Sequence, residues 1–453
     1  MERSVEEILA VLRELVESKD KEGLVRFLNE ELHPADLADI IDELDADERR
    51  EILELLQDEV IAAVMHELDY DDQSAILRIL GPDQASKILD EMSTDDIADL
   101  LGEVEPEEAG EILELLQEEE AAEVKELLGY KDDTAGGIMT PDFIAFPEHL
   151  SAHDAIEQMR IMAPDAETVY YLYVVDEDGK LVGVVSLREL IVAKPQTSLR
   201  DIMRRNVVSV HVNDDQEQVA KTISKYDLLA VPVINDDGVL LGIVTFDDAM
   251  DVIEEETTED FYRMAGTGAD EEEELLKGVW VKVSRRLPWL VFLLFTNFIS
   301  ANVIKGFTLT LEAVVALAYF IPVLMDMGGN VGTQSFAVVV RGLATGEVDR
   351  REVFRTVFKE AKVGLLLGLI CGTLVSLVVL AWQGSPFLGL VVGAALSLTL
   401  ITASVMGTLI PMVMERIGVD SAVAAGPFIT TVVDVTALLI YFWLATMFMH
   451  RIA

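Results

Sequence analysis

The sequence predicts a multidomain membrane protein that consists of an α-helical solenoid, a tandem α/β pair and an all-α domain of five transmembrane helices. Three observations support this fold class: an internal repeat near the N-terminus, a duplicated strand–turn–strand pattern, and long apolar segments in the last third of the chain. We expect domains at 1–131, 132–254 and 283–453, with α/β units at about 132–196 and 197–254 and an acidic connecting helix at 255–282.

The first domain contains the internal repeat. Residues 33–59 align without gaps on residues 93–119, with identical residues at positions such as Ile52 and Ile112. Apolar residues within each copy recur at spacings of three and four, which is the spacing of one helix face. A repeat of this length predicts stacked helix pairs, so we expect a helical solenoid over roughly residues 1–130.

The acidity of the chain is confined to the part that precedes position 283. The chain has 82 acids and 34 bases, of which residues 283–453 hold only 9 and 11, so the preceding part holds 73 and 23. Such a field repels nucleic acid and attracts cations, so we expect no nucleic-acid partner and consider a divalent metal the natural counter-ion. A solvated acidic surface is the alternative. The segment Met1–Asp20 lacks a signal-peptide pattern and the single cysteine, Cys371, falls in an apolar segment, which predicts a cytoplasmic soluble part.

The middle of the chain carries a β-rich pattern twice. Short β-rich runs flank the turn sequences at 176–179 and 235–238, and helical stretches intervene. The opening motif, Ile-Met, and the closing motif, Gly-x-Val followed by Ser or Thr, are also duplicated, at Ile138 and Ile202 and at Gly183 and Gly242. This ordered duplication resembles a pair of cystathionine-β-synthase-type (CBS) regulatory domains.

The resemblance to CBS domains implies a nucleotide site at the closing motifs. In that family the hydroxyl and the carboxylate of the motif contact a ribose, and a carboxylate can accept hydrogen bonds from both ribose hydroxyls. An adenine nucleotide such as ATP would then bind at Ser186, Arg188 and Glu189, or at Thr245 and Asp248. The alternative is that Ser186 and Thr245 only cap the helices that follow them.

An acidic segment that is compatible with a helix follows the second α/β unit. Asp248, Asp251, Glu255 and Glu259 are separated by three, four and four positions, so they share one helix face on which like charges repel. A bound cation would offset this repulsion, and oxygen ligands favour Mg2+ or Ca2+ over zinc. A solvated linker helix is the alternative.

Five segments are long and apolar enough to cross a membrane, at 287–304, 313–340, 363–382, 387–414 and 422–449. The loops at 305–312 and 383–386 hold only Lys305 as a base, whereas the loop between the second and third segments carries Arg341, Arg350, Arg351, Arg355, Lys359 and Lys362. With a cytoplasmic N-terminus and five spans, the positive-inside rule places this basic loop inside and the C-terminus outside a plasma or inner membrane.

The fifth segment carries one carboxylate, Asp434, and no other charge between residues 421 and 449. Thr430 and Thr431 precede it by four and three positions and so share its helix face. An ionisable group at membrane depth usually marks an ion or substrate path. We therefore expect Asp434 to mark an ion or substrate path.

The second segment contains residues that weaken a helix. It combines Pro322 with three glycines at 328–332, and Asn330 and Gln334 lie four positions apart on one face. Breaks of this kind are tolerated only against protein or water, so we expect Asn330 and Gln334 to line a pore with Thr430 and Thr431. Close helix packing is the alternative explanation for the glycines.

The order of these parts, the sequence Gly-Gly-Asn-Val-Gly-Thr-Gln at 328–334 and the sequence around Asp434 resemble the MgtE family of magnesium channels and transporters. The resemblance covers essentially the whole chain. It implies a homodimer that is not an enzyme, with the second and fifth spans lining a pore and Asp434 at the ion-selecting site. It also implies that cytosolic Mg2+, bound between the soluble domains and the connecting helix, holds the pore shut.

Several acids are candidate ligands for the regulatory Mg2+. Two of them, in the N-terminal repeat, are assigned by position only. The set is Asp247, Asp248, Asp251, Glu256, Glu259 and Asp260 on the connecting segment and Asp95 and Asp99 on the repeat. Asp248 is therefore claimed by both the metal and the nucleotide hypothesis. A further membrane acid, Asp326, either adds an ion site or pairs with Asn330.

Three other functions are alternatives to this one. An intramembrane aspartyl protease would use two membrane carboxylates, but Asp326 lacks the Gly-x-Gly-Asp context. A membrane-tethered nucleotide sensor would explain the CBS pair and leave Asp434 without a purpose. Among transporters, the alternative is a broader divalent-cation carrier that is coupled to Na+ or H+.

Overall fold

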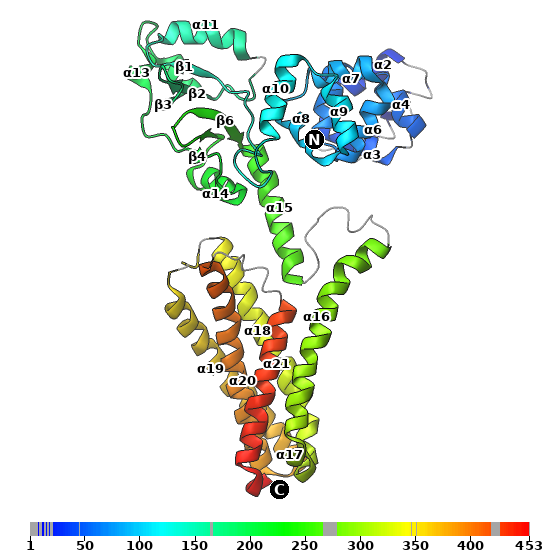
Figure 1. The fold of residues 1–453 in the computed structure, drawn as a ribbon, viewed down its shortest axis with the longest axis vertical. Coiled ribbons are helices and arrows are strands. Elements are labelled where there is room, and N and C mark those ends of the chain that lie inside the picture. The colour runs from blue at the N-terminus through cyan, green and yellow to red at the C-terminus, as the bar shows by residue number, and fades with distance from the viewer. Residues whose placement is uncertain are drawn as a thin grey trace. The chain divides into compact units, whose positions relative to one another are not determined.

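The computed structural model describes residues 21–44, 46–163, 166–265, 279–345, 347–349, 351–417 and 426–452, with the single positions 8, 11, 12, 15 and 18. The chain forms two compact units, Met1–Ile253 and Glu254–Ala453 (Figure 1). Each unit has hydrophobic cores of its own. The first unit contains the N-terminal helices and the α/β pair, and the second contains the apolar helices.

Residues 21–127 form consecutive short helices (Figure 1). They are α2 (Lys21–Arg26), the π-helix η1 (Phe27–Glu31), α3 (Pro34–Glu43), α4 (Ala46–Leu53), α5 (Asp58–Met65), α6 (Tyr70–Leu80), α7 (Pro82–Leu89), α8 (Thr94–Glu103), α9 (Pro106–Leu113) and α10 (Glu118–Leu127).

The predicted internal repeat is present in the helix boundaries. Helices α3, α4 and α5 begin at positions 34, 46 and 58, and α8, α9 and α10 begin at positions 94, 106 and 118, so the spacing of the three starts is the same in both copies. Helices also pack against the helix after next, as α3 does on α5 and α6 does on α8. Each helix buries one apolar face, with Ile40 of α3 and Leu100 of α8 fully buried. The helical solenoid is therefore confirmed.

The α/β pair consists of two three-stranded sheets with the same topology. The first unit has β1 (Ala145–Pro147), α11 (Ala152–Met162), β2 (Tyr171–Val175), β3 (Leu181–Ser186) and α12 (Leu187–Val192). After α13 (Leu199–Ile202), the second has β4 (Val210–His211), α14 (Gln216–Tyr226), β5 (Ala230–Ile234) and β6 (Leu240–Thr245). In each sheet the first strand is parallel to the second, and the second is antiparallel to the third.

The predicted turns connect the antiparallel strands in both units. Gly179 and Gly238 adopt φ of 77° and 79°, a backbone conformation that glycine adopts without strain. Asp176 and Asn235 stabilise the turns in the same way, because each side chain accepts hydrogen bonds from backbone N–H groups two and four positions later.

The opening motif of each α/β unit pairs with the closing strand of the other unit. Thr140 exchanges two backbone hydrogen bonds with Ile243 of β6, and Arg204 does the same with Val184 of β3. The glycine of each closing motif makes room for this exchange. A Cβ at Gly183, for example, would lie 2.5 Å from the sulfur of Met203. The two repeated motifs therefore hold the units together.

Helix α15 (Phe246–Ala265) contains the whole acidic segment 247–260. It begins at Phe246, earlier than the connecting helix expected at 255–282, and residues 266–278 of that expectation lie outside the described residues.

The apolar part contains α16 (Val279–Gly306), α17 (Thr308–Ala313), the 3-10 helix η4 (Val315–Phe320), α18 (Ile321–Ala344), α19 (Val353–Gln383), α20 (Pro386–Arg416), α21 (Gly426–Met447) and α22 (Met449–Ile452). By length and composition, the described residues include five segments able to cross a membrane: Lys282–Gly306, Val315–Ala344, Val353–Gln383, Pro386–Arg416 and Gly426–Met447. Helices α18 to α21 run side by side (Figure 1).

The expected extent of the basic loop is wrong. Arg355, Lys359 and Lys362 lie in α19 and not in a loop, and Arg341 lies in the last turn of α18. Long straight side chains are good helix formers, so they extend each helix beyond its apolar part.

The expected break in the second span is also wrong. The glycines of α18 do not interrupt it, since the helix is continuous from Ile321 to Ala344. They permit close packing instead: a Cβ at Gly329 would lie 2.9 Å from the Thr430 methyl group.

Helices α19 and α20 also approach each other closely. A Cβ at Gly368 would lie 2.7 Å from the carbonyl oxygen of Ser397, and the Ser397 hydroxyl donates a hydrogen bond to the Gly368 carbonyl at 2.7 Å. Ser376 makes the corresponding bond to the Gly389 carbonyl at 2.8 Å. Small residues and hydroxyls are typical of helix contacts in membranes, where the hydrophobic effect does not drive helices together.

Candidate functional site

The membrane carboxylate Asp434 lies on α21, which packs against α18. Its side chain is half-buried, and its Oδ1 atom is shielded from solvent without a hydrogen-bond partner among the described residues. A carboxylate oxygen left unpaired at this depth is costly, so it is a natural position for a cation.

The predicted hydroxyls near Asp434 are placed differently from each other. Thr430 and Thr431 donate hydrogen bonds to the carbonyls of Gly426 and Pro427, each at 3.0 Å, which leaves their oxygen lone pairs as acceptors. Thr431 is buried, whereas Thr430 faces α18 and lies 3.4 Å from the Thr333 hydroxyl. Thr333 was missed by the sequence analysis, because nothing in the sequence distinguishes its hydroxyl from any other.

The amides predicted to line a pore lie on the exposed face of α18. Gln334 and Asn330 are exposed on the described chain, and Asn330 donates a hydrogen bond to Asp326 at 3.3 Å. The pairing of Asn330 with Asp326 that was left open in the sequence is therefore present.

A second group of acids forms within the first unit, where α8 meets the α/β pair. We call it the acidic cluster, and it consists of Asp95 and Asp96 on α8, Glu167 before β2, and Asp247 and Asp248 at the start of α15. Burial raises the pKa of Asp95 well above its usual range, and the charges of Asp96, Asp248 and Glu167 raise it further. The Oδ1 atom of Asp95 is shielded from solvent and has no hydrogen-bond partner among the described residues.

Other members of the acidic cluster are perturbed in the same direction. Burial raises the pKa of Glu167 to about 7, with the charges of Asp248 and Asp247 adding to the effect. Burial also raises the pKa of Asp248, although hydrogen bonds from Thr245 oppose this. Burial is thus the main cause of these shifts, and the neighbouring carboxylates add to it.

His66 and Asp142 connect the acidic cluster to its surroundings. The hydrogen bond between His66 Nδ1 and Asp96, 3.0 Å long, raises the pKa of His66 to about 9, so the imidazole is positively charged at neutral pH. Asp142 accepts a hydrogen bond from the Thr94 hydroxyl at 3.2 Å at the start of α8, and its carbonyl accepts one from the Glu167 backbone at 2.8 Å. Glu167, Asp142 and His66 carry no sequence signal, since only the fold brings them to the cluster.

The remaining predicted metal ligands are dispersed. Asp99 is exposed one turn after Asp95 on α8, and Asp251 is exposed on α15. Glu256, Glu259 and Asp260 lie further along α15 in the second unit, where Glu259 forms an ion pair with Arg263. Among the described residues, no three His, Cys, Asp or Glu side chains are arranged to hold one metal ion together. The acidic cluster is therefore a set of separate carboxylates and not a closed metal cage.

The predicted nucleotide motifs are used as helix caps. Ser186 and Glu189 form a reciprocal capping box at the start of α12, and Arg204 donates two hydrogen bonds to Glu189 at 2.9 and 2.7 Å. The backbone N–H and the hydroxyl of Thr245 both donate hydrogen bonds to the Asp248 carboxylate at the start of α15. Arg188 is exposed. Capping by the side chain is therefore established for Ser186, and Asp248 belongs to the acidic cluster.

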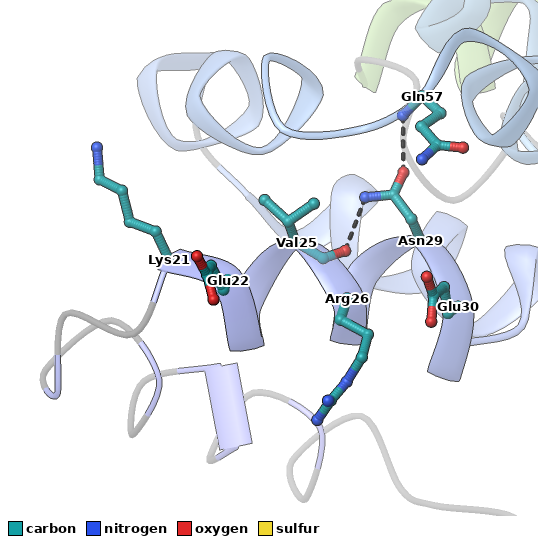
Figure 2. A pocket seen from close by; sticks show the side chains of 7 residues that line it. All are labelled: Lys21, Glu22, Val25, Arg26, Asn29, Glu30 and Gln57. Carbon is teal, nitrogen blue, oxygen red and sulfur yellow. Dashed lines mark hydrogen bonds between the residues drawn. The ribbon is translucent and has the colours of Figure 1, made fainter.

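The N-terminal helices also border a cavity that contains none of the predicted site residues (Figure 2). Asn29 connects two of the segments that line it: its amide donates to the carbonyls of Val25 and Leu55 at 2.8 and 3.0 Å and accepts from the Gln57 backbone at 2.7 Å. The cavity is lined by Lys21, Glu22, Val25, Arg26, Asn29, Glu30 and Gln57.

Comparison with known proteins agrees with this arrangement of domains. A family model described as a divalent cation transporter matches residues 321–444, one described as the MgtE intracellular N domain matches residues 32–133, and the CBS domain matches 135–195 and 199–255. The magnesium transporter MgtE of Enterococcus faecalis is 45% identical over 331 residues, which are 73% of this chain and 72% of that protein. The chain belongs to the MgtE family.

Other MgtE proteins are similarly close. The magnesium transporters MgtE of Bacillus subtilis and Thermus thermophilus are each 42% identical, over 73% and 75% of this chain and 72% and 75% of their own lengths. The family is one of transporters and not of enzymes, as expected.

Solved structures match the soluble part. The cytosolic domain of the Mg2+ channel MgtE in complex with ATP is 42% identical, with a TM-score of 0.51, and covers 53% of this chain and 98% of that one. The soluble part of a magnesium transporter is 39% identical, with a TM-score of 0.52, and the match covers 56% of this chain and 99% of that one. The N-terminal solenoid and the CBS pair are thus the cytosolic part of an MgtE protein.

Proposed function

We propose that this MgtE protein conducts Mg2+ into the cytoplasm along a path between α18 and α21, with Asp434 as the residue that holds the ion. The observation that carries the proposal is the half-buried Asp434 carboxylate, which has an oxygen without a hydrogen-bond partner among the described residues. The names of the MgtE relatives support Mg2+ as the transported ion.

The chemistry of the site suits a hydrated Mg2+ ion. Mg2+ gives up its water reluctantly and is usually bound through one or two carboxylates while it keeps several waters. Asn330 and Gln334, which are exposed on α18, and the hydroxyl of Thr430 would bind those waters, whereas Thr431 is buried and would act only by packing. Such a path needs no dehydrating cage.

The path would be completed by a second copy of the chain. Asp326, Asn330 and Gln334 are exposed on the described surface of α18, and polar groups at membrane depth require protein or water beside them. We propose a homodimer in which this face lines the pore, with the C-terminus of each chain outside the membrane.

Cytosolic Mg2+ would close the path by binding to the soluble part. The acidic cluster repels its own charge, and Asp95 has an unpaired buried oxygen, so a divalent cation stabilises the packed arrangement of the first unit. A ligand shifts a conformational equilibrium only through tighter binding to one state. We propose that the closed state binds Mg2+ more tightly, with Asp95 and Asp248 as central ligands and the other predicted acids as additional ones.

An adenine nucleotide is a second regulatory ligand in this proposal. The ATP complex of the similar cytosolic domain supports it. Asp248 lies among acids that would repel phosphates, so the exposed Arg188 near Ser186 is the better phosphate partner.

Flux measurements on the purified chain in liposomes test this function. Wild-type protein should take up Mg2+ at low internal Mg2+ and stop at millimolar internal Mg2+. Asp434→Asn removes the charge while keeping the shape of the side chain, and it should abolish or strongly reduce uptake. Asp349→Asn, in the exposed loop after α18, is the matched control and should behave like the wild type. Normal uptake by Asp434→Asn would refute the proposed ion site.

A further inference from the structure

The membrane unit holds a second carboxylate beside Asp434. Asp326 lies one turn before Asn330 on α18, and the Asn330 amide donates a hydrogen bond to Asp326 Oδ2 at 3.3 Å. Asp326 is also the charged residue whose field acts on the Asp434 carboxylate. The two acids come from different helices and are far apart in sequence, so only the packing of α18 on α21 brings them together.

That packing places the two acids at similar depth. A Cβ at Gly328 would lie 3.0 Å from the side chain of Val433, the residue before Asp434. Toward the other end of α21, the Tyr441 hydroxyl donates to the carbonyl of Leu317, which precedes α18. The helices are therefore antiparallel.

The position of Asp326 follows from this antiparallel arrangement. Because Gly328 packs at Val433, Asp326 lies within about one helical turn of the level of Asp434. The glycines of α18 make this possible, since larger residues would push the two helices apart.

The charge of this pair is not offset within the described chain. None of the ion pairs found there includes Asp326 or Asp434, and the hydrogen bond from Asn330 is neutral. A carboxylate exposed to lipid is costly, so a face with two of them requires water and cations beside it. A divalent cation offsets both charges, whereas a monovalent cation offsets only one.

We propose that Asp326 is a second ion-path residue, which together with Asp434 makes the path prefer divalent over monovalent cations, while Asn330 holds its carboxylate in place. The inference rests on the proposed conduction path at Asp434 and adds a determinant of selectivity to it. Asp434 attracts cations by its charge, and the Asp326 charge at nearly the same depth strengthens the preference for the ion of higher valence.

The test compares four variants in liposomes: Asp326→Asn, Asp326→Glu, Asp434→Asn and the loop control Asp349→Asn. Mg2+ uptake is measured against external Mg2+ concentration, and Na+ uptake is measured with and without Mg2+. Size-exclusion profiles of each variant establish that it is folded before its flux is compared.

We expect Asp326→Asn to raise the half-saturating Mg2+ concentration roughly ten-fold, which corresponds to about 1.4 kcal/mol of lost attraction. We also expect it to increase Na+ uptake relative to Mg2+ uptake. Asp326→Glu keeps the charge and should stay close to wild type in the ratio of Mg2+ to Na+ uptake. Asp349→Asn should match the wild type in both measurements.

Two results would overturn the inference. One is a wild-type half-saturation and ion preference in Asp326→Asn. The other is equal damage in Asp326→Asn and Asp326→Glu, which would mean that the shape of the side chain matters and its charge does not. A failure of the conduction path itself is distinguishable, because then the wild type would show no Mg2+ uptake or Asp434→Asn would show normal uptake.

Discussion

Replacing Glu167 by glutamine tests whether a charged carboxylate at this position limits the stability of the acidic cluster. Burial raises the pKa of Glu167 from 4.5 to about 7, the charges of Asp248, Asp247 and Asp96 add to this, and His66 opposes it. A shift of this size corresponds to about 3 kcal/mol at 1.36 kcal/mol per pH unit. Because Glu167 is exposed on one side, solvent screening reduces the expected effect to about 1 kcal/mol.

The sign of the effect follows from proton linkage. The pKa of Glu167 is higher in the folded than in the unfolded chain, so its ionisation destabilises the fold. The protonated side chain carries no penalty below about pH 4.5, and the penalty grows until it is complete above about pH 7. Glu167→Gln should therefore stabilise the first unit at pH 8 and have little effect near pH 4.5.

Hydrogen–deuterium exchange of the α8 amides in the full-length protein measures this stability locally. At pH 8 in EDTA, α8 should exchange about five-fold more slowly in Glu167→Gln than in the wild type, which is the factor given by about 1 kcal/mol. Saturating Mg2+ should shrink the difference, because the metal relieves the same repulsion. Glu177→Gln, in the exposed turn after β2, is the control. An equal gain at both pH values would contradict the reasoning.

Three further predictions concern gating and packing. Millimolar Mg2+ should protect the first unit from proteolysis and EDTA should expose it, and identical digestion patterns would argue against a closed state held by metal. A second variant changes four acids of α15 together to alanine, namely Asp247, Asp251, Glu256 and Glu259. It should still conduct Mg2+ but should no longer be inhibited by internal Mg2+. A variant that is closed at every Mg2+ concentration would eliminate the bridging-ligand hypothesis. Gly368→Leu should destabilise the membrane unit by about 3 kcal/mol, because its side chain would collide with the backbone of Ser397, and a thermal midpoint equal to that of wild type would refute the close packing seen between α19 and α20.

Much of the fold could be predicted because its local signals repeat. The offset between the two copies of the repeat in the sequence is also the offset between the helix starts, as with α3 and α8. The two turns of the α/β pair have the same structure, because Gly179 and Gly238 both adopt a positive φ. The repeated turn sequence therefore predicted both of them. Apolar length alone located the membrane helices, although charged ends such as that of α19 extended beyond the apolar part.

The candidate sites were less predictable because they depend on contacts between distant parts of the chain. Asp434 could be proposed as an ion-path residue from its apolar context alone, without tertiary information. Glu167, by contrast, lies in a loop with no pattern and joins Asp95 only through the docking of α8 on the α/β pair. The exposed acids of α15 and the acids of the cluster are all aspartates and glutamates. The sequence alone could therefore not tell which of them lie together in the fold.

The exchange of opening motifs between the two α/β units bears on how this module could have arisen. Each unit receives a strand-like segment from its neighbour, Thr140 at Ile243 and Arg204 at Val184, and each leaves a slot over Gly183 or Gly242 for the other's methionine. A single unit on its own would have both an unfilled slot and an unplaced methionine. A second copy of the same unit could fill the slot with its own methionine. An ancestral single unit would therefore have been a self-associating protein. Gene duplication would then have turned that association into an intramolecular one. Either α/β unit, when produced on its own, should again self-associate.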